Sequence, residues 1–96
     1  MNDSTGFTIP STHPALAGHF PDLPVVPGAV ILDHVIAAWG APCRAIALAK
    51  FHTPLGPDQP VEVHFEPARD ADQVRFSCWR GTDLICSGLI LVAPVQ

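Results

Sequence analysis

His19 and Asp33 are the two side chains of this 96-residue sequence whose type and spacing best suit chemistry. Three prolines fall among positions 20–27, and each restricts its own φ and extends the residue before it, so His19 lies in a stiff loop. Asp33 interrupts an apolar run that begins at Gly28. An imidazole and a carboxylate held by stiff elements among apolar residues are suited to acid–base chemistry on an apolar substrate.

The elements that must position these two side chains are a loop and a helix. Residues 28–39 are predicted to be helical, since the segment starts after a proline and ends before Gly40. Only Asp33 and His34 are polar in it, and a helix that is apolar nearly all round is expected inside a core. The seventeen positions 11–27 are predicted to be a loop, and a loop of that length in a compact domain is often functional.

Alternation of apolar and polar residues indicates strands in the rest of the chain. The last of them is more uniformly apolar, as a strand covered on both faces would be. One buried helix followed by an antiparallel meander predicts an α+β fold with the helix on the concave face of the sheet. The predicted strands are 6–9, 44–51, 61–66, 74–79 and 84–92.

Several segments resemble a known family. Gly18-His19-Phe20-Pro21 and Pro24-Val25-Val26-Pro27-Gly28, followed by Ile31-Leu32-Asp33, are similar to the signature of the 3-hydroxyacyl-acyl carrier protein dehydratases of type II fatty acid synthesis. The resemblance continues at Lys50-Phe51 and at 83–88, and covers nearly all of the chain. That family has the hotdog fold, in which an antiparallel β-sheet wraps around one long central helix. The resemblance therefore implies a single hotdog domain over residues 1–96.

The resemblance also implies roles for individual residues. His19 would take a proton from C2 of a 3-hydroxyacyl thioester, and Asp33 would protonate or orient the hydroxyl that leaves C3. The backbone N–H of Gly28 would meet the thioester carbonyl, because the N–H groups at a helix N-terminus are unpaired. Substrate-binding residues expected along an acyl tunnel are Phe20, Val25, Val30 and Phe51, with Trp39 as a further candidate. No metal and no organic cofactor is required.

The expected partners follow from the same resemblance. The substrate would be carried by the phosphopantetheine of an acyl carrier protein, although a coenzyme A thioester stays an alternative. In the family, the histidine and the acid of one site come from different subunits of a dimer, so a homodimer is expected here, with a heterodimer or a higher oligomer as alternatives. Acyl carrier proteins are acidic and this chain has a net charge of −4, so docking would need a local basic patch.

Each of these residues also has a plainer interpretation. His19 would merely brace the proline loop, Asp33 would face solvent or bond to that loop, and Gly28 would be a simple turn glycine. His34 is expected to be structural or interfacial, because its side chain points about 100° away from that of Asp33. The other three histidines are expected to be exposed to solvent; they are His13, His52 and His64.

Composition excludes several classes of protein. A charge of −4 with only five Lys and Arg argues against nucleic-acid binding. The sequence has neither the pattern of a signal peptide nor that of a membrane span, and its three cysteines lack metal-ligand spacing. A cytoplasmic protein with reduced thiols is therefore expected. A domain of this size buries a limited core, so a partner subunit would stabilise it.

The sequence departs from the family pattern in three places. Position 22 is Asp where the family commonly has Gly, Asp33 stands where Glu is more usual, and the chain starts almost at its first strand. These features are more similar to the small dehydratases of accessory pathways, such as aryl polyene synthesis. Two other functions stay open: a hotdog thioesterase in which Asp33 activates water, and a non-catalytic subunit of a heterodimeric dehydratase.

Overall fold

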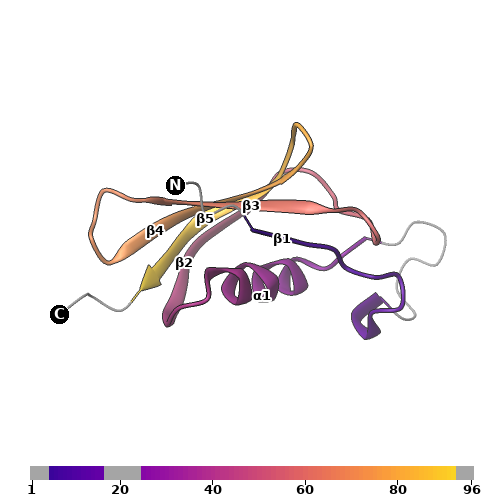
Figure 1. Ribbon diagram of the computed structural model, residues 1–96, viewed down its shortest axis with the longest axis horizontal. Helices are drawn as coiled ribbons and strands as arrows, with labels where there is room; N and C mark the ends of the chain where they lie inside the picture. Colours follow the sequence, from indigo (N-terminus) through magenta and orange to yellow (C-terminus); the bar gives the residue numbers. More distant parts are fainter. Residues whose placement is uncertain (1–4, 17–24, 93–96) are drawn as a thin grey trace.

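One helix and five strands form the part of the chain that the computed structural model describes, residues 5–16 and 25–92. The strands make an antiparallel sheet in the order β1-β3-β4-β5-β2, and α1 lies along one face of it (Figure 1). A short 3-10 turn, Pro14–Leu16, precedes the helix. The bounds are β1 Thr5–Phe7, α1 Gly28–Trp39, β2 Cys43–Phe51, β3 Val61–Pro67, β4 Gln73–Arg80 and β5 Asp83–Val92.

Helix α1 begins and ends where its flanking residues predict. Pro27 occupies the N-cap position with extended φ and ψ, and Gly40 ends the helix in the left-handed conformation with φ of 70°. The helix has twelve residues, a length common in globular proteins, so the prediction of a long central helix is not confirmed.

Only one side of α1 is buried in the single chain. Val30, Ile31 and Val35 enter the core, whereas Asp33 and Ile36 are exposed on the opposite side. The expectation of a helix surrounded by core is therefore wrong for one subunit, because the sheet covers a single face of it. The apolar side chain of Ile36 is 37% exposed on this uncovered side.

His34 has the structural role expected for it. Its Nδ1 lies 3.0 Å from the carbonyl oxygen of Val30, one turn earlier in the helix. Its ring lies 4.9 Å from the ring of Phe7 on β1, measured between centroids. His34 therefore fastens the helix to the first strand.

The first strand lies slightly earlier than predicted. It ends at Phe7, so Ile9 is not part of it. Ile9 is nevertheless fully buried in the core, and its carbonyl accepts a hydrogen bond from Asp58 N–H at 2.7 Å. Ile9 continues the alternation of the strand in the sequence, but in the structure its buried side chain anchors the start of the loop.

A bulge lets strand β5 bury two consecutive residues. Cys78 pairs with Cys86 and Trp79 with Leu84, so Ile85 is an extra residue. Both Ile85 and Cys86 are fully buried as a result. Cys78 and Cys86 are free thiols that share a hydrogen bond, and this bond, together with burial, raises the pKa of Cys78.

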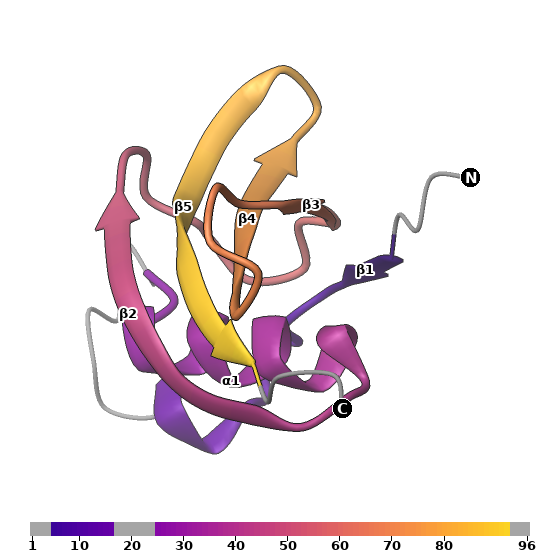
Figure 2. The ribbon, with the colours of Figure 1, turned by 90° about the vertical axis from the view of Figure 1, so that its left-hand side faces the viewer.

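Strand β2 forms an edge of the sheet and is irregular. Its pairing with β5 shifts register twice, between Cys43 and Ala45 and between Ile46 and Leu48. The shifts bend the strand, and Figure 2 shows β2 and β5 curving past the helix. The second shift brings the carbonyl of Leu48 over Gly88, where an added Cβ would lie 2.0 Å from that oxygen.

We expect Gly88→Ala to lower the free energy of unfolding by about 3 kcal/mol, the upper end of the cost of overpacking, because backbone must move to admit the methyl group. Chemical denaturation monitored by circular dichroism measures the change. Ser87→Ala, at the neighbouring position of β5, is the matched control and should cost less than about 1 kcal/mol. Equal stability of the two variants would contradict this account of the β2 bulge.

No helix in the described part of the chain is long and apolar enough to cross a membrane.

Candidate active site

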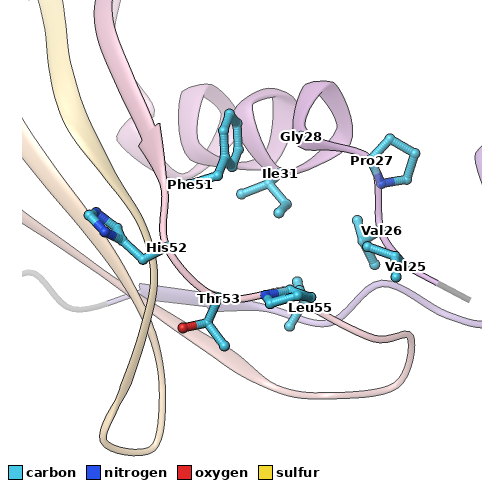
Figure 3. Close-up of a pocket in the computed structure, with 10 residues that line it drawn as sticks. Val25, Val26, Pro27, Gly28, Ile31, Phe51, His52, Thr53 and Leu55 are labelled. Atoms are coloured by element: carbon cyan, nitrogen blue, oxygen red, sulfur yellow. The ribbon is translucent and has the colours of Figure 1, made fainter. Parts of the chain in front are cut away.

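An apolar cavity of about 400 Å³ opens at the N-terminal end of α1 (Figure 3). Its volume falls in the range of small-molecule sites. The helix contributes its first turn, and the connection between β2 and β3 forms the opposite wall. The lining residues are Val25, Val26, Pro27, Gly28, Ile31, Phe51, His52, Thr53, Pro54 and Leu55.

Gly28 and Phe51 lie against each other in the wall of this cavity. A Cβ added to Gly28 would lie 2.6 Å from Cζ of Phe51, so the ring packs where a side chain would otherwise stand. Pro27 at the N-cap makes no side-chain hydrogen bond to the helix. The Val30 and Ile31 N–H groups donate to the carbonyl of Pro27 at 3.0 and 3.3 Å, whereas Gly28, as the first helical residue, has no carbonyl acceptor for its N–H within the helix. The helix dipole makes that end electropositive. The arrangement can receive a polar oxygen at the end of an apolar cavity.

The cavity contains part of the predicted site. Gly28, Val25 and Phe51 line it. The side chains of Val25 and Phe51 are 38% and 53% exposed, so both are accessible to an apolar ligand. Val30 is buried in the core and does not line the cavity. His19 and Phe20 lie outside the described residues.

Trp39, the further tunnel candidate, also lies away from the cavity. It is the last residue of α1, and its indole packs on Phe65 with 5.0 Å between ring centroids. The eleven helical steps from Gly28 to Trp39 correspond to about 16 Å of helix. Trp39 therefore supports the far end of the helix.

Asp33 faces away from the cavity of its own chain. It is exposed, and it follows Ile31, which lines the cavity, by two positions. Two residues correspond to about 200° around a helix, so the two side chains point in nearly opposite directions. The five residues from Gly28 place Asp33 about 140° away from that glycine as well. The Asp33 carboxylate is therefore directed to solvent and not to the cavity of its own chain.

Sequence reasoning missed several residues of the cavity. Ile31 follows Gly28 by one helical turn, and that i,i+3 spacing would have found it. Leu55 is fully buried behind the cavity and accepts a hydrogen bond from Val26 N–H at 2.8 Å, a contact with no sequence signal.

His52 was expected only to be exposed, and it is exposed. Its imidazole points away from the apolar side chains of the cavity (Figure 3), and its Nε2 lies 2.9 Å from Oγ of Ser87. The backbone N–H of His52 donates to Ile85 O at 2.8 Å. These contacts hold the end of β2, and with it Phe51, against the sheet.

The other histidines differ in their surroundings. His64 is partly exposed and lies 3.1 Å from a carboxylate oxygen of Glu62 on the same strand. His13 is partly buried. Across residues 5–16 and 25–92, no three His, Cys, Asp or Glu side chains come close enough to hold a metal ion.

Comparison with known proteins identifies the family. Residues 3–89 match the family described as ApeI-like, the ApeI dehydratase. The chain belongs to this family of dehydratases. It is also 30% identical over 79 residues to the 3-hydroxyacyl-[acyl-carrier-protein] dehydratase FabZ of Agrobacterium fabrum, an alignment that covers 68% of this chain and 51% of that protein. The ApeI-like chain thus spans about half the length of this curated relative.

Two solved structures share the fold. The dehydratase heterocomplex ApeI:P from Xenorhabdus doucetiae superposes with a TM-score of 0.73 at 22% identity, over 92% of this chain and 83% of that one. A protein from Erwinia carotovora subsp. atroseptica gives 0.72 at 22% identity, over 96% and 82%. These likenesses support the hotdog-like arrangement of a five-stranded antiparallel sheet with one helix.

Proposed function

We propose that the protein dehydrates a 3-hydroxyacyl thioester to the trans-2-enoyl thioester. His19 removes a proton from C2, the electron pair forms the C2–C3 double bond, and Asp33 gives a proton to the hydroxyl that leaves C3 as water. The N–H of Gly28 donates to the thioester oxygen while negative charge gathers there. The observation that carries the proposal is the apolar cavity lined by Gly28, the first residue of α1, in a chain of a dehydratase family.

The site is completed by a second copy of the chain. Asp33 points away from the cavity that its own Gly28 and Ile31 line, so the carboxylate is available to the site of another subunit. The same outer side of α1 carries exposed Ile36, and the edge strand β2 exposes Leu48. A long edge strand and an apolar helix face are surfaces that proteins normally cover. A homodimer formed through α1 and β2 covers both.

An acyl carrier protein is the proposed donor of the substrate, and Lys50 is the basic residue best placed to dock it. Lys50 is exposed and precedes Phe51, which lines the cavity. Arg80 contributes less to docking, because its guanidinium is engaged within the chain by Pro54, Gln59 and Asp83.

We expect Lys50→Glu to raise the KM for a carrier-bound substrate by about tenfold, with a smaller effect in high salt, because the carrier is acidic. The matched control is Arg69→Glu, in the turn between β3 and β4, which lies at the other end of the sheet from the start of α1 (Figure 1). Steady-state kinetics with carrier-bound and coenzyme A-bound substrate measures both. An equal effect of the two substitutions, or no effect of Lys50→Glu on the carrier-bound substrate, would contradict docking at Lys50.

The substrate class that we propose is a polyene-type acyl chain of an accessory pathway, such as aryl polyene synthesis. The match of residues 3–89 to an ApeI-like family supports it. Dehydration rates measured with saturated and conjugated 3-hydroxyacyl chains of equal length test this substrate class. Activity on saturated chains alone would rule out the polyene assignment.

A heteromeric assembly is the second candidate. The similar protein of Xenorhabdus doucetiae is a dehydratase heterocomplex, so this chain would be one subunit of a mixed pair. A purified homodimer that turns over substrate would exclude a purely non-catalytic role.

The ultraviolet absorbance of the enoyl thioester tests the proposed reaction. Conjugation of the new double bond with the thioester carbonyl raises that absorbance, whereas a thioesterase releases the thiol, which a disulfide reagent detects. We expect the first signal and not the second. Thiol release without a rise in absorbance would replace dehydration with hydrolysis.

A further inference from the structure

Arg80 bonds to the connection between β2 and β3 instead of extending into solvent. It is the last residue of β4, and its side chain is 26% exposed. Its Nη1 donates to Pro54 O at 3.1 Å and to Gln59 Oε1 at 2.9 Å, and Nη2 lies 3.2 Å from Oδ2 of Asp83. The turn after Arg80 favours this direction, because Gly81 adopts φ of 61° and Arg80 pairs directly with Asp83.

The hydrogen bonds of Arg80 link the two ends of the connection between β2 and β3. Pro54 and Gln59 lie near its two ends, and one guanidinium reaches both of them. The same Oε1 of Gln59 also accepts a hydrogen bond from Gly56 N–H at 2.9 Å. A rigid planar fork that bridges two acceptors fixes their separation in a way that a single flexible donor does not.

The connection in turn holds both described ends of the segment that contains His19. At one end, Asp58 N–H donates to Ile9 O at 2.7 Å, and the Asp58 carboxylate accepts from Ser11 N–H at 3.2 Å. At the other end, Val26 N–H donates to Leu55 O at 2.8 Å. Residues Ser11 and Val26 thus flank His19 in sequence and are anchored to one short stretch of chain.

The conformation of Asp58 shows that this anchoring is constrained. Among the described residues, Asp58 is the single non-glycine with positive φ, at 62°. That region is sparsely populated by residues with a side chain, although aspartate tolerates it better than most. Asp58 keeps this conformation while both its N–H and its carboxylate bond to the His19 segment, so the connection and that segment are coupled.

We propose that Arg80 is a positioning residue for the dehydratase site: by fixing the connection 54–59 it fixes both ends of the segment that carries His19. Arg80 does not line the cavity, although Pro54 and Leu55 do. The kinetic part of this inference rests on the proposed function. A misplacement of the order of 1 Å in a reacting group can cost about a hundredfold in rate, so a residue remote from the substrate can control turnover.

Hydrogen exchange of two backbone amides tests the positioning without requiring turnover. In Arg80→Ala, we expect the Val26 and Asp58 amides to exchange about tenfold faster, with the Phe76 amide in the core strand β4 unchanged. Gln59→Ala, a milder substitution, should produce the same local pattern. Unchanged exchange at Val26 and Asp58, or equal acceleration at Phe76, would overturn the proposal.

Kinetics then tests the consequence for catalysis. Arg80→Ala should lower kcat by about tenfold to a hundredfold while KM changes by less than about threefold, and Arg80→Lys should recover part of the loss. Arg75→Ala, at an exposed position of the same strand, should leave kcat unchanged. A lower melting temperature with wild-type kcat would reduce Arg80 to a stabilising residue and overturn the proposal. If the wild-type protein dehydrates nothing, the proposed function fails, while the exchange experiment still decides whether Arg80 positions the segment.

Discussion

Mixing two inactive variants, His19→Ala and Asp33→Ala, should restore activity. Each variant alone is expected to turn over substrate at least about a thousandfold more slowly, because each lacks one partner of the acid–base pair. Asp33 faces away from the cavity of its own chain, so in the proposed homodimer each site takes its carboxylate from the other subunit. A mixed dimer therefore contains one intact site and one site that lacks both groups.

The fraction of wild-type activity that is recovered depends on the fraction of mixed dimers. Random exchange of chains puts half of the dimers in the mixed form, so activity should reach about a quarter of the wild-type value at equal total chain concentration. The variants are unfolded and refolded together to exchange subunits, and the same variants refolded apart and then combined on ice are the control. No recovery after verified exchange would mean that His19 and Asp33 of one chain act together, and the shared site would be wrong.

Gly28→Ala should abolish most of the activity for a reason that can be separated from packing. The added methyl group would lie 2.6 Å from the Phe51 ring and would also crowd the N–H that we propose binds the thioester oxygen. Loss of an oxyanion donor costs about a hundredfold to a thousandfold in kcat, and we expect a decrease in that range. Steady-state kinetics and thermal unfolding of the same preparations give the activity and the stability.

The double variant Gly28→Ala, Phe51→Leu separates the two effects, with Phe51→Leu alone as the matched control. Removing the ring relieves the packing conflict, so stability should return toward that of Phe51→Leu while kcat stays low. Recovery of kcat together with stability would show that Gly28 is required only for packing and turn geometry. In that case the thioester oxygen would have to bind another donor.

The helix and the later strands could be predicted because their signals are local. Pro27 and Gly40 bracket α1 through backbone preferences that act within a residue or two. Alternating burial along β3 follows from the geometry of any strand with one covered face. The resemblance of the His19 and Gly28 segments to dehydratases was equally local, and the family match to residues 3–89 confirms it.

The features that sequence did not predict depend on contacts between distant segments. The two shifts in β2 depend on how its backbone meets Gly88 on a neighbouring strand. Val30 and Ile31 are both apolar, and only the direction of the helix relative to the sheet decides which of them lines the cavity. The exposure of Asp33 could not be predicted for the same reason. The apolar residues around it predict a helix covered on all sides, whereas the sheet of the single chain covers only one side of α1.

Mass spectrometry of a 3-hydroxyacyl carrier protein after incubation with the purified protein tests the central claim most directly. The carrier-bound acyl group should lose the mass of one water with the wild-type chain, and should remain unchanged with His19→Ala and with Asp33→Ala. Release of the free acid, leaving the bare carrier, would contradict dehydration and identify a thioesterase. Loss of water that persists in both variants would contradict the assignment of the acid–base pair.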